Sequence, residues 1–450
     1  IILPYSEVSG IMPHAFLAVN TVPADCSALR APTILPNIRI PWDMHPTFML
    51  ILGLLTLASC KLKNGKNYAI MGGQTNSRQT VRETAAEGRK RKRQMRDWRE
   101  GVRRVEPYVP GEQPSERRMI KLNTNENPYP PAPGVERALR ELDADRLRLY
   151  PDPEAGILVD ALAEYYKVKP SRIFVGVGSD DVLAMAFLTF FNSEQPILFP
   201  DITYSFYDVW AGLFRIPYRQ VPLDEKFQIR PSDYFGENGG IVFPNPNAPT
   251  GEELPQEAIE EILKHNRNSV VIVDEAYVDF GAKSALPLLE KYDNLLVVQT
   301  FSKSRSMAGM RIGFCVGSEE MIRCLNDVKY SFNSYTMDQT ALILGAEAVK
   351  DREYFDRTRG EIMDTREWTK GELRRLGFCF GDSRANFIFA AHERVPAEKI
   401  FQALREQHIY VRYFRKPRIS NYLRITIGTR EEMRELIDFL EHWLPSANEE

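Results

Sequence analysis

Short apolar segments bounded by turn residues recur through the second half of the chain. They lie at 197–199, 241–243, 270–273, 295–298 and 312–316. Helical patterns separate several of them, for example at 255–265 and 319–330. Buried strands linked by helices are typical of a mostly parallel sheet whose two faces are covered. We therefore predict an α/β fold with a mostly parallel central sheet flanked by helices.

The C-terminal part of the chain follows a different pattern. Strand candidates lie at 386–390 and 423–427, and an amphipathic stretch closes the chain at 431–443. This stretch places five apolar residues at helical spacing, namely Met433, Leu436, Ile437, Leu440 and Trp443. The spacing predicts a helix that covers a second core. A smaller α+β domain is therefore expected after the main sheet.

The length of 450 residues is more than one hydrophobic core usually fills. Hydrophobic residues at 43% and charged residues at 26% are ordinary for a globular protein, so composition favours no special class. The patterns predict four parts. These are an atypical extension at 1–94, an arm with part of the small domain at 95–147, a large domain at 148–345 and a small domain at 346–450.

Charge is distributed unevenly along the chain. Residues 1–94 carry 12 Lys and Arg against 5 Asp and Glu, whereas residues 95–450 carry 46 against 56. The second part is acidic, so it has no electrostatic reason to bind nucleic acid or an anionic membrane. The five cysteines are scattered without metal-ligand spacing. Neither a metal site nor a disulfide framework is therefore expected, and a reducing cytoplasm is the default compartment.

One apolar run in the extension resembles part of a secretory signal. It occupies 48–60, and its last residues, LASC, are similar to a lipoprotein cleavage box. The run is shorter than the roughly 20 residues that a membrane helix needs. No basic residue lies between Arg39 and Lys61 to form a charged flank. We therefore expect no membrane anchoring.

Five consecutive basic residues follow at 89–93. Such a run is compatible with nucleic-acid binding or nuclear targeting. A solvated, disordered linker is the simpler interpretation, and we favour it. The sequence changes character at Met95, which is our preferred native start; residues 1–94 are then expected to be disordered or not native.

Polar residues follow several predicted strands, where the ligands of an open α/β sheet bind. The first group, GVGSDD at 176–181, lies between a strand at 173–175 and an apolar helix at 182–191. Its glycines let the backbone approach a phosphate, and the helix N-terminus supplies free N–H groups. A tight strand-to-helix turn explains these residues equally well. The third glycine of a dinucleotide fingerprint is absent, which disfavours a Rossmann dehydrogenase.

Three more strand ends carry polar residues that suit one chemistry. Asn247 lies in NPNAPTG, Asp274 and Tyr277 lie in DEAY, and Lys303 lies in TFSK. A carboxylate at the end of a buried strand needs a positive partner, and a pyridinium nitrogen is one. A lysine with a neutral amine can form a Schiff base with an aldehyde. Alone, Lys303 would be interpreted as a surface lysine; together with Asn247 and Asp274 it indicates a covalently bound cofactor.

Basic and hydroxyl side chains provide candidate anion sites. Thr300 and Ser302 flank the lysine, and Arg311 follows eight residues after it, a combination that suits a phosphate monoester. Arg412 and Arg424 are candidates for a two-pronged contact with carboxylate or phosphate. A surface salt bridge is the alternative for Arg412, and it is less attractive for Arg424 inside the apolar segment LRITI.

From residue 95 to about 446 the chain resembles the fold-type-I pyridoxal-phosphate-dependent aminotransferases, and within them most closely the group that acts on histidinol phosphate. The motifs that carry the resemblance are WREGVRRVEPYVPGEQP, LNTNENPYPPAP, YPDP, GVGSDD, PDITYSFY, NPNAPTG, VIVDEAYVDF, TFSKSRSMAGMRIGF and VRYFRKPRISNYLRITIGTREE. The set is specific for the superfamily, and its first and last members point to the group. One departure is Ser304-Arg305-Ser306, where related enzymes often have Gly or Ala after the lysine; the extra charge could alter the substrate pocket.

The resemblance implies a role for each matching residue. Lys303 would hold the pyridoxal phosphate covalently, and Asp274 would pair with its ring nitrogen. The rest of the cofactor would contact Ser179, Asp180, Ser302 and Arg311 at the phosphate, Tyr204 at the ring face, and Asn247 and Tyr277 at the ring 3-oxygen. Tyr150 would reach the phosphate of a neighbouring subunit, which implies a homodimer. The substrate would meet Arg424, Arg412 and Asn127.

The implied reaction converts glutamate and imidazole-acetol phosphate to 2-oxoglutarate and histidinol phosphate, a step of histidine biosynthesis. Alternatives with similar sequences are an aromatic or broad-range aminotransferase and a threonine-phosphate decarboxylase. A remote alternative is a transcription regulator that carries an aminotransferase-like domain. Residues 1–88 show no three-helix amphipathic pattern, which argues against the regulator.

Overall fold

The computed structural model of the chain describes residues 97–109, 111–114 and 118–447. The chain divides into two compact units, residues 1–101 and residues 102–450. The described part of the first unit holds the 3-10 helix η1 (Trp98–Gly101). The signal-like run at 48–60, the basic run at 89–93 and the proposed start at Met95 lie outside the described residues.

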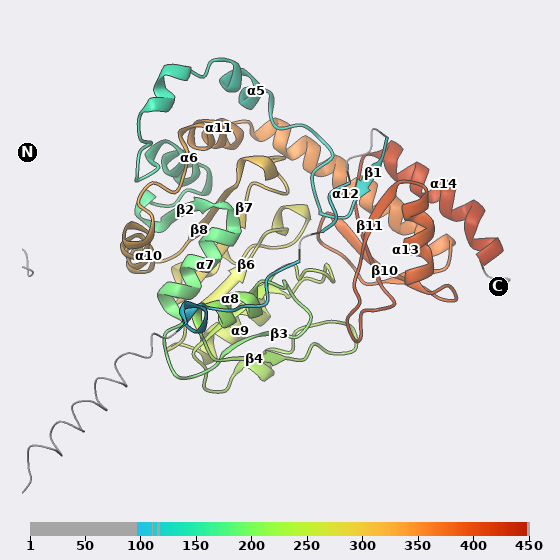
Figure 1. Ribbon diagram of the computed structural model, residues 1–450, viewed down its shortest axis with the longest axis horizontal. Helices are drawn as coiled ribbons and strands as arrows, with labels where there is room; N and C mark the ends of the chain where they lie inside the picture. Colours follow the sequence, from blue (N-terminus) through green and yellow to red (C-terminus); the bar gives the residue numbers. More distant parts are fainter. Residues whose placement is uncertain (1–96, 110, 115–117, 448–450) are drawn as a thin grey trace, which may run out of the picture. The chain divides into compact units, whose positions relative to one another are not determined.

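The second unit contains a seven-stranded sheet. Its strands are β2 (Ile173–Val177), β3 (Ile197–Pro200), β4 (Tyr218–Val221), β5 (Gly240–Pro244), β6 (Val271–Asp274), β7 (Leu295–Thr300) and β8 (Ile312–Val316). Their order across the sheet is β2-β8-β7-β6-β5-β3-β4. Only β8 runs antiparallel to its neighbours; the other pairs are parallel. The predicted mostly parallel α/β sheet is confirmed (Figure 1).

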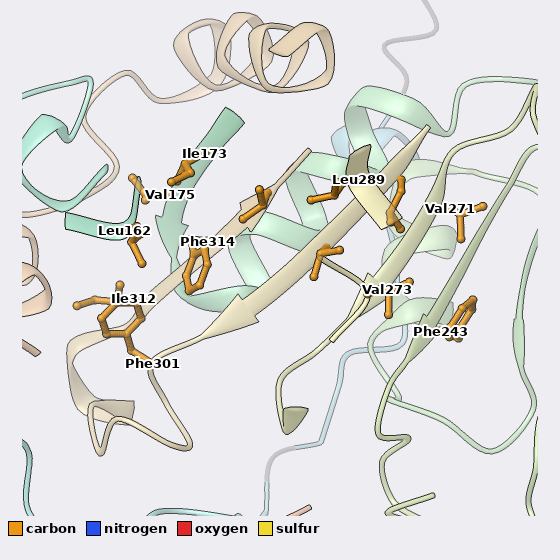
Figure 2. Close-up of a cluster of buried hydrophobic side chains, with 14 of the residues drawn as sticks. Leu162, Ile173, Val175, Phe243, Val271, Val273, Leu289, Phe301, Ile312 and Phe314 are labelled. Carbon is orange, nitrogen blue, oxygen red and sulfur yellow. The ribbon is translucent and has the colours of Figure 1, made fainter. Parts of the chain in front are cut away.

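Helices cover both faces of this sheet. One face packs against α7 (Gly178–Phe190), α8 (Tyr207–Phe214) and α10 (Glu319–Phe332). The other packs against α5 (Pro133–Arg140), α6 (Gly156–Tyr166), α9 (Gln256–His265) and α11 (Gln339–Lys350). Successive residues of β6 enter opposite cores, because strand side chains alternate between faces. Ile272 belongs to the core on the side of α7, α8 and α10. Val271 and Val273 belong to the core on the other face, which is drawn in Figure 2.

A second sheet of the same unit has five strands. Its strands are β1 (Ile120–Leu122), β9 (Phe378–Phe380), β10 (Phe387–His392), β11 (Ile409–Tyr413) and β12 (Leu423–Thr426), in the order β1-β11-β12-β10-β9. The helices α12 (Arg352–Arg375), α13 (Ala397–Glu406) and α14 (Arg430–Ala447) pack with it. The predicted closing helix is α14; its apolar face is buried at Met433, Leu436, Ile437 and Leu440, while Trp443 is half-buried at the edge.

Short 3-10 turns complete the described structure. They are η2 (Ala144–Arg148), η3 (Pro170–Arg172), η4 (Pro231–Tyr234), η5 (Val278–Phe280), η6 (Leu286–Glu290) and η7 (Ala308–Met310). Among the described residues, none of the helices is both long and apolar enough to span a membrane.

The register of the parallel strands brings their carboxyl ends to one edge of the sheet. Pro244 at the end of β5 pairs with Asp274 at the end of β6, and Asp274 pairs with Val298 near the end of β7. The residues that follow these strands therefore emerge side by side. Gly313 of β8 lies against the start of α7 at the same edge; a Cβ on it would lie 2.3 Å from the backbone carbon of Gly178 and from the nitrogen of Ser179.

We predict that Gly313→Ala destabilises the protein by about 1–3 kcal/mol, because the added methyl group must push apart β8 and the start of α7. Thermal unfolding measures the effect. Gly371→Ala is the matched control, since Gly371 is exposed on α12 and nothing lies within 4 Å of an added Cβ. That control should leave the midpoint unchanged or raise it. An unchanged midpoint for Gly313→Ala would contradict the packing described here.

Candidate active site

A cavity of about 170 Å³ lies at the carboxyl ends of β5, β6 and β7. A cavity needs about 10–15 Å³ of such space to hold one water molecule. This cavity is on the order of ten times larger, so it can hold a small organic ring. Its lining residues are Thr124, Glu126, Ser179, Asp180, Tyr204, Pro244, Ala248, Asp274, Ala276, Tyr277, Thr300, Ser302, Lys303, Ala308 and Arg311. Eight of the residues predicted for the cofactor are thus brought together in one cavity.

Lys303 enters the cavity from the loop after β7. Its Nζ donates a hydrogen bond to the backbone oxygen of Thr124 at 3.0 Å and lies 5.8 Å from the centre of the Tyr277 ring. Asn127 secures the lysine backbone: its Nδ2 donates to the carbonyl oxygens of Lys303 at 3.0 Å and of Ser304 at 3.2 Å. The Lys303 amine is therefore hydrogen-bonded to a backbone carbonyl, and the backbone of Lys303 is held by Asn127. The contact of Asn127 with substrate stays a prediction.

Asp274 lines the same cavity at the end of β6. Only 4% of its surface is exposed, and burial raises the pKa of its carboxyl to about 6. Its Oδ2 accepts a hydrogen bond from the hydroxyl of Tyr207 at 2.9 Å, and its Oδ1 accepts one from the Ala276 N–H at 3.2 Å. Among the described residues no basic side chain forms an ion pair with it. A buried carboxylate without a cation is costly, so this site suits a ligand that brings a positive charge.

The next residue, Glu275, is also buried but serves a different purpose. Its carboxylate accepts hydrogen bonds from the Ala285 N–H at 2.6 Å, the Ser284 hydroxyl at 2.7 Å and the Gln299 amide at 2.8 Å. Burial raises the pKa of Glu275 to about 7. These three donors satisfy the group within the fold, in contrast to Asp274, which faces the cavity.

The lining residues Ser179, Ser302 and Arg311 form an anion cradle. The Arg311 Nη2 donates to Asp180 Oδ2 at 3.1 Å, and its Nη1 donates to the Ser302 hydroxyl at 3.4 Å. The N-terminus of α7 opens at Gly178, with Ser179 in its first turn. A Cβ on Gly178 would lie 2.5 Å from Arg311 Nη2, so the close approach of this guanidinium requires glycine. A guanidinium, hydroxyls and a helix N-terminus together fit a phosphate group.

The remaining predicted cofactor residues have defined partners. Tyr204 lines the cavity and donates its hydroxyl to Asp180 Oδ1 at 2.7 Å. Tyr277 also lines the cavity, and its hydroxyl accepts from Asn125 Nδ2 at 2.9 Å. Asn247 lies outside the cavity lining; its amide nitrogen donates to the Ile202 carbonyl at 2.9 Å and to the Thr250 hydroxyl at 3.0 Å. Its contact with a cofactor oxygen stays a prediction.

Arg424 lies on β12, opposite Arg412 of β11 in the strand register. Its Nη2 donates to the Asn123 carbonyl at 3.0 Å, but its Nε is buried without a hydrogen-bond partner among the described residues. Burial lowers the pKa of Arg424, and its electrostatic neighbours include the tyrosines Tyr277 and Tyr204 of the cavity. A guanidinium with an unused buried donor beside the cavity is suited to an anionic substrate.

Tyr150 lies elsewhere on the protein surface. Its side chain is 82% exposed and stacks on Tyr335 with ring centres 4.6 Å apart. The cavity lining of this chain does not include it. Its predicted contact therefore requires a second subunit and stays a prediction.

The sequence did not indicate Tyr207, Asn125 or Thr124. Tyr207 binds Asp274, Asn125 binds Tyr277, and the Thr124 carbonyl binds Lys303. The only sequence signal for Tyr207 is its place in the PDITYSFY motif, three residues after Tyr204. Asn125 and Thr124 lie next to Asn127 in NTNENP, so that whole segment could have been assigned to the site.

Comparison with known proteins identifies the family. Residues 117–440 match the family model described as aminotransferase class I and II. The chain is 51% identical over 347 residues to a histidinol-phosphate aminotransferase of Lactococcus lactis, covering 77% of this chain and 98% of the relative. It is 53% identical over 345 residues to one of Pseudomonas putida, covering 77% and 99%.

Solved structures agree on the fold. The histidinol-phosphate aminotransferase of Sinorhizobium meliloti, in complex with pyridoxal-5'-phosphate, superposes with a TM-score of 0.66 at 22% identity, covering 74% of this chain and 92% of that one. The enzyme of the same name from Clostridium acetobutylicum gives a TM-score of 0.67 at 21% identity, covering 73% and 100%.

The buried carboxylate predicts a pH dependence of stability in the cofactor-free protein. The pKa of Asp274 rises from 3.8 to about 6 on folding, so the folded state binds more protons between these values. Stability is therefore lost as the pH rises through this window. Asp274→Asn has no carboxyl to titrate, so this loss of stability should be absent from the variant. Between pH 4 and 7, the free energy of unfolding of the variant should rise relative to that of the wild type by up to about 3 kcal/mol.

Urea unfolding of both cofactor-free proteins across this range measures the difference. Asp364→Asn, on the exposed face of α12, is the matched control and should show no such trend. A difference between Asp274→Asn and wild type that does not vary with pH would show that the carboxylate is not held in a costly environment.

Proposed function

This chain belongs to the class I and II aminotransferase family, and we propose that it transfers the amino group of glutamate to imidazole-acetol phosphate, forming 2-oxoglutarate and histidinol phosphate. The observation that carries the proposal is the single cavity that Lys303 and Asp274 share with the anion cradle at Arg311. The relatives at about half identity bear the name of this reaction and are matched over nearly their whole length.

The cofactor of the proposal is pyridoxal phosphate. When bound, it supplies an aldehyde that takes up amino groups and a ring that withdraws electrons from the carbon beside them. Lys303 would hold the aldehyde, Asp274 the ring nitrogen, and Arg311 with Ser302 and Ser179 the phosphate. The fit is supported by the buried Asp274 carboxylate, which lacks a cation, and by the close approach of Arg311 to Gly178.

The side chains of this chain then have distinct tasks. Asp274, as a carboxylate, would keep a proton on the ring nitrogen. The Lys303 amine would act as the general base that removes the proton from the substrate Cα. Asn127 holds the Lys303 backbone in place through its hydrogen bonds to the carbonyl oxygens of Lys303 and Ser304.

Arg424 is proposed to bind the carboxylate of glutamate and the phosphate of histidinol phosphate in turn. Its unpartnered buried Nε supports this role. Arg412 lies opposite it in the register and adds positive charge. Two cations suit a phosphate dianion better than a neutral aromatic side chain, which favours the phosphorylated substrate over phenylalanine.

We propose that the active enzyme is a homodimer. Large apolar side chains are exposed near Tyr150, at Leu147, Leu149, Phe332 and Tyr335. A cluster of this kind is suited to contact with a second subunit, which would also bring Tyr150 to the partner's site. The cytoplasm is the proposed compartment, since the described cysteines, Cys315, Cys324 and Cys379, are free thiols.

The proposal predicts the substrate preference of the first half-reaction. Histidinol phosphate should convert the bound cofactor to its amino form with a second-order rate constant on the order of 100-fold above that of phenylalanine. The reason is that phenylalanine leaves the arginines without a partner. Stopped-flow absorbance measures both rates. A faster reaction with phenylalanine would favour the aromatic aminotransferase, and release of CO₂ from threonine phosphate would favour the decarboxylase.

Arg424→Gln should raise KM for histidinol phosphate roughly 30-fold or more, because a charge-assisted contact with the phosphate is lost. Affinity for pyridoxal phosphate should change little, since Arg424 is not among the residues that line the cofactor cavity. Steady-state kinetics and cofactor titration measure the two quantities. Arg434→Gln, on the exposed side of α14, is the matched control. Equal KM values for wild type and Arg424→Gln would remove Arg424 from the substrate site.

A further inference from the structure

Tyr207 makes the one side-chain contact to Asp274 among the hydrogen bonds of the described residues. It is completely buried, and its hydroxyl donates to Asp274 Oδ2 at 2.9 Å. The other carboxylate oxygen accepts from the Ala276 N–H, so each oxygen has one donor from the protein. The orientation of the carboxylate is therefore defined by a backbone group on one side and by Tyr207 on the other.

The Tyr207 ring has little freedom to move. Tyr207 is the first residue of helix α8. The centre of its ring lies 5.8–6.2 Å from the ring centres of Phe187, Phe199, Tyr204 and Trp210. Aromatic packing on all these sides prevents the phenol from turning towards water. The hydroxyl is thus held at Asp274 whether or not a ligand is bound.

The charge state of this contact is also defined. Burial raises the pKa of the Tyr207 phenol well above its usual value, so Tyr207 remains a hydrogen-bond donor at neutral pH. Burial and the nearby Asp180 raise the pKa of Asp274, whereas the Tyr207 hydrogen bond lowers it. The other ionisable side chains that share the cavity are Tyr204, Tyr277, Lys303, Arg311 and Glu126. None of them donates a hydrogen bond to Asp274 in the described structure, so the groups that lower its pKa are the Tyr207 hydroxyl and the Ala276 N–H.

We propose that Tyr207 is a positioning residue that keeps Asp274 ionised and correctly oriented, so that Asp274 can hold the proton on the ring nitrogen of the bound cofactor. The inference rests on the proposed function and deepens it. Removing the hydroxyl would leave the ring in place but would take one donor from a buried carboxylate. Asp274 would then be neutral in a larger fraction of molecules near neutral pH, and a neutral acid does not stabilise a cationic ring nitrogen.

The test compares Tyr207→Phe with Tyr234→Phe in the full chain. Tyr234 is a matched control because it is 1% exposed and its hydroxyl has no partner among the described residues. Tyr207→Phe should weaken pyridoxal phosphate binding about tenfold or more at pH 7, since a hydrogen bond to a charged group is lost. It should lower kcat while KM for histidinol phosphate changes less than about twofold. Tyr234→Phe should match wild type in both.

The pH profile separates this role from a general structural one. As the pH rises from 6 to 8.5, Asp274 ionises again in Tyr207→Phe, so its cofactor affinity and the visible absorbance of its bound cofactor should approach those of wild type. A defect of the same size at every pH would overturn the proposal. So would a variant whose affinity and profile match those of Tyr234→Phe.

A double-mutant cycle tests whether Tyr207 acts through Asp274. In an Asp274→Asn background, Tyr207→Phe should have no further effect on cofactor affinity. An additional loss of the same size as in wild type would mean that Tyr207 acts independently, which would overturn the inference. Failure of the proposed function would look different, because the wild-type chain itself would then neither bind pyridoxal phosphate nor react with histidinol phosphate.

Discussion

The arrangement of this protein depends on one buried carboxylate that has no cation of its own. Asp274 lies at the end of a central strand, 4% exposed, with hydrogen bonds from Tyr207 and Ala276 but no ion pair in the described structure. We propose that a ligand with a positive ring nitrogen offsets this cost. A buried carboxylate of this kind lowers the stability of the protein, as is common where activity requires a strained or charged site.

Strand register places the Asp274 carboxylate beside the other residues of the cavity. Parallel pairing of β5, β6 and β7 places the ends of three strands side by side, so Asp274 and Lys303 face one cavity although 28 residues separate them. The antiparallel strand β8 then returns the chain to β2, which sets Arg311 beside the start of α7. The connectivity of a single sheet thus brings together the three groups for which we propose these roles: the acid at the ring nitrogen, the amine at the aldehyde and the cradle at the phosphate.

Much of this could be predicted because buried strands leave a clear apolar pattern. The five apolar runs correspond to β3, β5, β6, β7 and β8, and the strand at 173–175 corresponds to β2. β4 was not predicted, since three of its four residues are exposed at the sheet edge. β1 and β11 pair in parallel across a long stretch of sequence, a contact that local periodicity cannot indicate. Helix α7 begins at Gly178, four residues before the predicted start, because the acidic residues Asp180 and Asp181 suit the first turn of a helix.

The site itself was predicted from residue types at strand ends and from the family resemblance, and the cavity contains most of those residues. Residue types alone did not identify Tyr207 and Asn125, because a tyrosine at a helix start or an asparagine in a loop indicates no chemistry until the fold supplies its partner. Borohydride reduction of the holoenzyme, followed by peptide mass analysis, tests most directly whether Lys303 holds the cofactor in the cavity that it shares with Asp274. We predict that the reduced cofactor is attached to Lys303 alone; attachment to a different lysine, or to none, would show that Lys303 does not hold the cofactor.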